Sequence, residues 1–122
     1  MGKQIKEGRR VDQSIEVGST PGGIRVIVES VPYVHTVALS VTATVGSRDE
    51  RKQESGVSHF LEHMLFRGTE TRDYREINEQ IEASGGYLNA YTTHEHTSYY
   101  AFTIDESLQV GEELLADLFL NP

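Results

Sequence analysis

The run from Ser55 to Gly68 is the feature that most constrains the fold of this chain. It reads Ser-Gly-Val-Ser-His-Phe-Leu-Glu-His-Met-Leu-Phe-Arg-Gly and contains no proline. Ser55 suits the N-cap of a helix, and Gly68 suits the left-handed residue with which many helices end. The run therefore predicts one short helix.

The two sides of this predicted helix differ in chemistry. At about 100° per residue, five apolar side chains fall on one side, which we expect to pack against a core. They are Val57, Phe60, Leu61, Met64 and Leu65. His59, Glu62 and His63 fall on the opposite side, because spacings of three and four residues bring side chains above one another. Two imidazoles and one carboxylate thus share a patch.

This patch suits a metal site. Two histidines one turn apart can direct a ring nitrogen at one ion at about 2.1 Å, the distance that zinc takes from imidazole. Glu62 would then lie beside the ion, where it can take a proton from water and pass it to a leaving amine. The alternative is structural: His59 and His63 bonded to the backbone, with Glu62 as a neutralising neighbour.

Alternating apolar and polar residues predict five strands in the rest of the chain. They cover residues 14–17, 24–29, 34–45, 87–92 and 97–104, and the turn Thr20-Pro-Gly-Gly23 joins the first two. Asp73 and Glu76 form a capping box for a second helix, which ends at Ser84-Gly85-Gly86. Asp105 is expected to cap a third helix, whose apolar side carries Leu108, Leu115, Leu118 and Phe119. This order predicts an α+β fold with helices packed on one face of a largely antiparallel sheet.

Composition narrows the classes of partner. The net charge of −8 argues against nucleic acid and anionic membranes. The chain contains no cysteine, so histidine and carboxylate groups must do any metal binding. Neither a leader sequence nor an apolar run long enough to span a membrane is evident. We therefore expect a cytoplasmic protein in which residues 1–12 form a loose arm.

Two segments carry a family resemblance. GVSHFLEHMLFRGT (56–69) and INEQIEASGGYLNAYTTHEHTSYYAF (77–102) resemble the N-terminal catalytic region of the pitrilysin-type (M16) zinc peptidases. This family includes the mitochondrial processing peptidase and insulin-degrading enzyme, and H-x-x-E-H is its inverted zinc-peptidase motif. The similarity extends from about Ile24 to the C-terminus. Residues 13–122 are therefore expected to form the N-terminal part of an M16-like domain, truncated at its C-terminus.

The resemblance also implies roles for individual residues. It makes His59 and His63 zinc ligands and Glu62 the catalytic base. It places Asn89 and Ala90 on a sheet edge, where an extended substrate would add as a further strand. Positions corresponding to Glu95, Thr97 and Tyr99 belong to the framework in this family. His94 and His96 are accordingly not expected to bind the metal.

The functional expectation follows from these assignments. The chain is expected to be the catalytic region of a zinc-dependent endopeptidase that acts on a peptide or small protein. The resemblance places a third zinc ligand, a glutamate, beyond Pro122, so we expect a fragment with little activity alone. We also expect self-association or pairing with a second M16-like half. The alternative is a non-catalytic M16-like subunit that uses the same sheet edge for peptide binding or assembly.

Overall fold

The computed structural model describes residues 14–122, so the predicted arm over residues 1–12 lies outside the described residues. The described residues fall into two compact units, one that ends at Val34 and one that covers His35–Pro122. Over the described range, no helix is both long enough and apolar enough to cross a membrane.

The described part of the first unit is a β-hairpin. β1 (Ile15–Ser19) pairs with β2 (Arg25–Glu29) in antiparallel fashion, with Ser19 opposite Arg25. At the turn, the Gly23 N–H donates to the Thr20 carbonyl at 2.9 Å, and Gly23 has a φ of +86°, which suits glycine. The predicted hairpin is confirmed.

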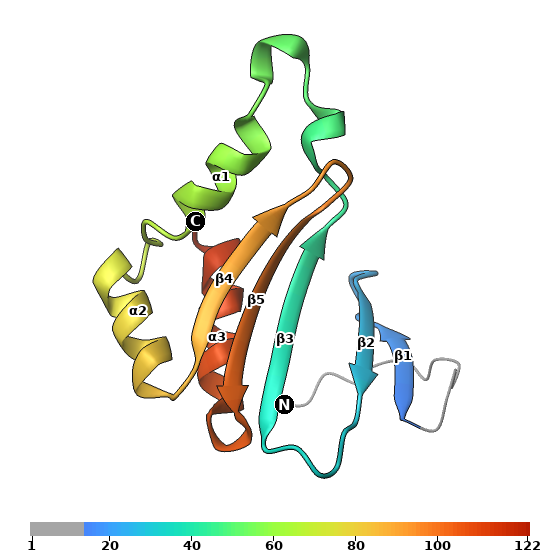
Figure 1. The fold of residues 1–122 in the computed structure, drawn as a ribbon, viewed down its shortest axis with the longest axis vertical. Coiled ribbons are helices and arrows are strands. Elements are labelled where there is room, and N and C mark those ends of the chain that lie inside the picture. The colour runs from blue at the N-terminus through green and yellow to red at the C-terminus, as the bar shows by residue number, and fades with distance from the viewer. Residues whose placement is uncertain (1–13) are drawn as a thin grey trace. The chain divides into compact units, whose positions relative to one another are not determined.

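The second unit is built on a three-stranded antiparallel sheet (Figure 1). Its strands are β3 (Thr36–Ala43), β4 (Tyr87–Thr92) and β5 (Thr97–Ile104), in the order β3-β5-β4. Leu39 of β3 lies opposite Ala101 of β5, and Ala90 of β4 lies opposite Tyr99 of β5. Within the described sheet, β4 is therefore an edge strand with β5 as its one neighbour.

Three helices pack against this sheet: α1 (Val57–Leu65), α2 (Tyr74–Ala83) and α3 (Leu108–Leu120). Short 3₁₀ turns cover Ser47–Asp49, Lys52–Glu54 and Asp105–Ser107. The core lies between the sheet and the helices and consists of Ile77, Ile81, Tyr99, Ala101, Leu114, Leu115 and Leu118. The predicted α+β fold, with its helices on an antiparallel sheet, is confirmed.

The two predicted caps have different outcomes. At α2 the Glu76 N–H donates to Asp73 at 2.8 Å, and the Asp73 N–H donates to Glu76 at 2.8 Å, so the capping box is present. Asp105 instead opens a 3₁₀ turn, and α3 begins three residues later, after Ser107. The prediction that Asp105 caps α3 was wrong because an extra turn precedes the helix.

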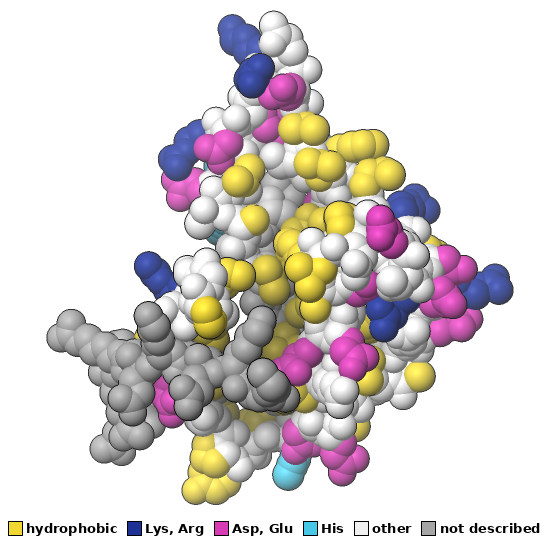
Figure 2. All heavy atoms as spheres, turned by 180° about the vertical axis from the view of Figure 1, so that it is seen from behind, with side chains coloured by type: hydrophobic (Ala, Val, Ile, Leu, Met, Phe, Trp, Pro, Cys, Tyr) yellow, Lys and Arg dark blue, Asp and Glu magenta, His cyan; other side chains and the backbone are white. Residues whose placement is uncertain are grey.

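The predicted orientation of α1 was also wrong. Phe60, Leu61 and Met64 of the expected inner face are 61%, 54% and 46% exposed, whereas Glu62 is 8% exposed. Hydrophobic side chains accordingly gather on the surface over α1 (Figure 2). The amphipathic pattern shows that the two faces of the helix differ, but it does not show which face packs on the sheet. In the structure, Glu62 faces the sheet because it accepts a hydrogen bond from Thr92 of β4.

Candidate metal site and substrate edge

The two histidines of α1 lie side by side. The Nε2 atoms of His59 and His63 are 3.0 Å apart, and the ring centroids are separated by 4.6 Å. Both side chains are exposed, while Glu62 between them is buried. One ligand atom from each of the three residues lies within 4.8 Å of the others. Among residues 14–122, this is the group of three that could hold a metal ion.

The donor set fits zinc. Zinc binds imidazole nitrogen at about 2.0–2.1 Å, and a tetrahedral angle then places two such nitrogens about 3.4 Å apart. The observed separation of 3.0 Å is within a small ring rotation of that value. Zinc in catalytic sites takes three protein ligands and leaves one position open. His59 and His63 can supply two of these ligands.

The Glu62 side chain is held in place by a residue of the sheet. The Thr92 hydroxyl of β4 donates to Glu62 Oε2 at 2.6 Å, a short charge-assisted hydrogen bond. Burial raises the pKa of the neighbouring Tyr99 phenol, and the negative charge of Glu62 raises it further. Tyr99 therefore stays neutral beside the carboxylate.

The start of α1 is held by a carboxylate from the preceding loop. Gly56, rather than the predicted Ser55, is the N-cap, with a φ of +92° and no side-chain cap. Glu50 takes that role, because it accepts hydrogen bonds from the Gly56 N–H at 2.7 Å and the Ser58 N–H at 2.9 Å. These bonds hold the pKa of Glu50 below its ordinary value. The loop thus sets the position of the first turn, which carries His59.

The same loop is bonded to the turn between β4 and β5. The Ser47 and Arg48 N–H groups donate to the carbonyls of Thr93 and His94 at 3.0 and 2.9 Å. A Cβ on Gly46 would lie 2.4 Å from the Thr93 carbonyl oxygen, so this approach needs glycine. The path from β3 to α1 is therefore tied to the end of β4.

His94 and His96 lie in this turn and make other contacts. His94 Nδ1 is 2.8 Å from the Ser47 hydroxyl, and His96 Nδ1 is 3.1 Å from the Thr93 hydroxyl. Glu95 pairs with Arg48 at 2.6 Å. Neither histidine belongs to the three-residue group on α1.

The backbone of Ala90 faces the free edge of β4. The Thr93 N–H donates to the His96 carbonyl at 2.8 Å, which identifies 93 and 96 as a hydrogen-bonded pair. Because such pairs alternate along an antiparallel ladder, Asn89 pairs with Tyr100, and the backbone groups of Ala90 point away from β5. The Ala90 N–H donates instead to the side-chain oxygen of Asn89 at 2.8 Å. Asn89 can therefore offer its side chain to a ligand, whereas Ala90 can offer its backbone.

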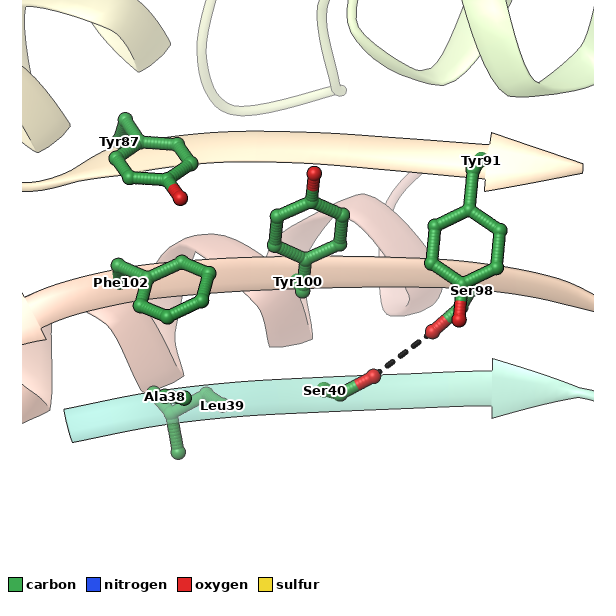
Figure 3. Close-up of a pocket in the computed structure, with 8 residues that line it drawn as sticks. All are labelled: Ala38, Leu39, Ser40, Tyr87, Tyr91, Ser98, Tyr100 and Phe102. Carbon is green, nitrogen blue, oxygen red and sulfur yellow. Dashed lines mark hydrogen bonds between the residues drawn. The ribbon is translucent and has the colours of Figure 1, made fainter.

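The face of the sheet opposite the helices is aromatic. A shallow hollow of about 400 Å³ lies over it, lined by Ala38, Leu39, Ser40, Tyr87, Tyr91, Ser98, Tyr100 and Phe102 (Figure 3). Tyr87 stacks on Phe102 with a centroid distance of 4.9 Å, and the Ser40 and Ser98 hydroxyls are 2.8 Å apart. Asn89 lies between Tyr87 and Tyr91 on the same strand.

Two residues of this site, Glu50 and Thr92, were not predicted from the sequence. Glu50 lies in a charged loop that gives no local sign of a capping role. Thr92 lies two residues after Ala90, so the alternation of side chains along β4 places both on the helix side of the sheet. This alternation was the one indication in the sequence that Thr92 could contact a helix. Pairing it with Glu62 required knowing that α1 packs on β4.

The chain is similar to the proteins of one known family. Residues 25–122 match the model of Insulinase (Peptidase family M16). The chain is 43% identical to an uncharacterized zinc protease of Mycobacterium leprae over 98% of this chain and 27% of that protein. It is 44% identical to an uncharacterized zinc protease of Bacillus subtilis, over 81% of this chain and 24% of that protein. A probable mitochondrial-processing peptidase subunit beta of Arabidopsis thaliana is 43% identical, over 86% of this chain and 20% of that protein.

The chain thus spans about a quarter of the length of the curated relatives it matches. The family model covers most of the chain, including α1 with its H-x-x-E-H motif and the edge strand β4. The predicted resemblance is therefore confirmed, and the chain belongs to the insulinase family of peptidases, M16.

Proposed function

We propose that this chain is the catalytic region of a zinc-dependent endopeptidase that hydrolyses peptide bonds with water as the nucleophile. The observation that carries the proposal is the pair of Nε2 atoms 3.0 Å apart on His59 and His63, with the buried Glu62 carboxylate beside them. The relatives' description as zinc proteases agrees with it.

Each residue of the site has a separate task. His59 and His63 would hold the ion, which when bound polarises the scissile carbonyl and lowers the pKa of the attacking water. Glu62 accepts a proton from that water and donates it to the leaving amine. Its hydrogen bond from Thr92 engages Oε2, so Oε1 is the oxygen left for this transfer.

The free edge of β4 is the proposed substrate site. An extended peptide would pair with the backbone of Ala90, which gives affinity with little dependence on sequence. The Asn89 amide would first have to release the Ala90 N–H that it now accepts. Alternate side chains of the bound peptide would then lie near Tyr87 and Tyr91. Peptides or small proteins in extended conformation are therefore the proposed substrates.

The alternative is a non-catalytic subunit that binds peptides or assembles through the same edge. The exposed apolar side chains of α1, Phe60, Leu61 and Met64, favour assembly with a second M16-like half or with another copy. In both proposals the edge of β4 binds peptide, and the two differ in the need for zinc.

Hydrolysis of a quenched fluorescent peptide distinguishes these proposals. It is measured on the chain alone and on a chimera in which the chain replaces the matching part of the Mycobacterium leprae relative. We expect the zinc-loaded chimera to cleave the peptide, the isolated chain to cleave it weakly, and Glu62→Gln to abolish cleavage with zinc content unchanged. Full activity of Glu62→Gln would remove Glu62 from its proposed role. Peptide affinity that neither a chelator nor His63→Ala changes, without cleavage, would favour the binding subunit.

A further inference from the structure

We propose that Thr92 is a positioning residue, which holds the Glu62 carboxylate in the orientation that proton transfer needs. This inference rests on the proposed role of Glu62 as the base. It starts from the 2.6 Å hydrogen bond between the Thr92 hydroxyl and Glu62 Oε2. Glu62 is 8% exposed, so little water is available to replace this partner.

The helix alone does not fix the carboxylate. A glutamate side chain has three rotatable bonds, and two staggered torsions separate its carboxyl group from the backbone of α1. A hydrogen bond to Oε2 removes this freedom and leaves Oε1 unoccupied by Thr92. The carboxylate then has one oxygen for support and one for the proton.

Thr92 is well placed to act as a fixed support. Threonine is branched at Cβ and therefore stiff at χ1. Its strand β4 pairs with β5 along the register from Tyr87–Phe102 to Thr92–Thr97. The same strand carries Ala90, two residues away, whose backbone faces the proposed substrate edge. One strand would thus hold both the base and the peptide, and an error of about 1 Å between such groups can cost about 100-fold in rate.

A simpler role for the Thr92 hydroxyl is purely structural: it would satisfy a buried carboxylate and do nothing more. Both roles predict some loss of stability when the hydroxyl is removed. They differ in catalysis, because only positioning predicts a fall in kcat with little change in KM, together with recovery when serine restores the hydroxyl.

The test uses Thr92→Val and Thr92→Ser, with Thr97→Val as the matched control. Thr97 lies directly opposite Thr92 in the sheet, and its hydroxyl donates to the Val45 carbonyl at 3.0 Å. In the zinc-loaded chimera, we expect Thr92→Val to lower kcat by about 10- to 100-fold, with KM changed by less than about two-fold. Thr92→Ser and Thr97→Val should stay within about three-fold of the unsubstituted protein, since each keeps the donor to Glu62.

A structural readout accompanies the kinetics. Crystal structures of the unsubstituted chain and of the Thr92→Val and Thr92→Ser variants are compared at the Glu62 carboxylate. We expect this carboxylate to be displaced in Thr92→Val and restored in Thr92→Ser. Should Thr92→Val fail to fold by circular dichroism, Thr92→Cys replaces it, because a thiol has similar size and is a weak donor.

The possible outcomes separate this inference from the proposed function. If Glu62→Gln abolishes hydrolysis but Thr92→Val keeps the full kcat, the positioning role is overturned and the role of Glu62 stands. If no protein cleaves the peptide, the proposed function fails, and the crystal structures decide about Thr92. In that case, an unchanged position of the Glu62 carboxylate in Thr92→Val would overturn the inference. A carboxylate that is displaced in Thr92→Val and returns to its original position in Thr92→Ser would support it.

Discussion

Glu50 and Ser58, eight residues apart, are joined by a 2.9 Å hydrogen bond from the Ser58 N–H to the Glu50 carboxylate. The other carboxylate oxygen accepts the Gly56 N–H at 2.7 Å. The first N–H groups of a helix have no partner within the helix, and a negative charge there is favourable. Glu50 thus anchors the turn of α1 that carries His59.

Removal of this anchor should loosen α1. We expect Glu50→Ala to lower the thermal unfolding midpoint and to weaken zinc binding several-fold, because His59 loses its fixed position. Differential scanning calorimetry and zinc titration measure the two effects. Glu54→Ala is the control, since Glu54 lies in the same loop and contacts Arg51 at 3.8 Å. Equal effects of the two substitutions would show that Glu50 has no special role at the helix start.

Zinc binding should depend on the histidines of α1 and not on those of the β4–β5 turn. We expect His63→Ala to weaken zinc binding by at least about 100-fold, because loss of a supporting residue alone can cost that much. His94→Ala should leave the affinity within about two-fold, since His94 contacts Ser47 and lies outside the group on α1. Calorimetric titration of the metal-free chain measures both. Equal losses would mean that the turn contributes a ligand.

Features coded by neighbouring residues could be predicted from the sequence. The capping box of Asp73 and Glu76, the first hairpin and the strands over 87–92 and 97–104 each depend on a local pattern, and each is present. The three-residue group of α1 was predictable for the same reason, because helical spacing alone brings His59, Glu62 and His63 together.

Features that depend on packing between distant segments could not be predicted. The choice of which face of α1 meets the sheet depends on the contact between Glu62 and Thr92, thirty residues apart. Likewise, Glu50 could not be identified as a cap, because the shape of residues 46–56 follows from bonds to Thr93 and His94. Neither α1 nor residues 46–56 contain a sequence pattern that indicates these partners.

Asp117 shows how the loop after α1 is fixed. This buried side chain of α3 accepts hydrogen bonds from the Thr69 and Thr71 hydroxyls, Arg72 and Asn121 at 2.6 to 2.9 Å. Burial opposes its ionisation, but these bonds outweigh burial and hold the pKa of Asp117 far below its ordinary range. Asp117 therefore acts as a structural acceptor that ties the loop after α1 to α3.

The Asp117 network should make stability depend on pH. A carboxyl group whose pKa is lower in the folded state stabilises the protein fully above its unfolded pKa of about 3.9, and this contribution disappears as the pH falls below that value. We expect Asp117→Asn to cost about 3 kcal/mol at pH 7 and to flatten the decline of unfolding free energy below about pH 4. Urea unfolding at several pH values measures this. An unchanged acid profile would show that Asp117 does not cause it.

Thr103 on β5 is buried against α3 with its hydroxyl unpaired, the one such buried side-chain atom in the described part of the chain. Its methyl group faces Gly111 of α3. A Cβ added to Gly111 would lie 3.1 Å from this methyl group. Thr103→Val keeps both branches at Cβ and removes the unpaired hydroxyl, so we expect unchanged stability or a gain of up to about 1 kcal/mol. Thr97→Val removes a paired hydroxyl from the same strand and should cost about 1 kcal/mol. Urea unfolding compares the two, and a larger loss for Thr103→Val would mean that its hydroxyl has a partner in solution.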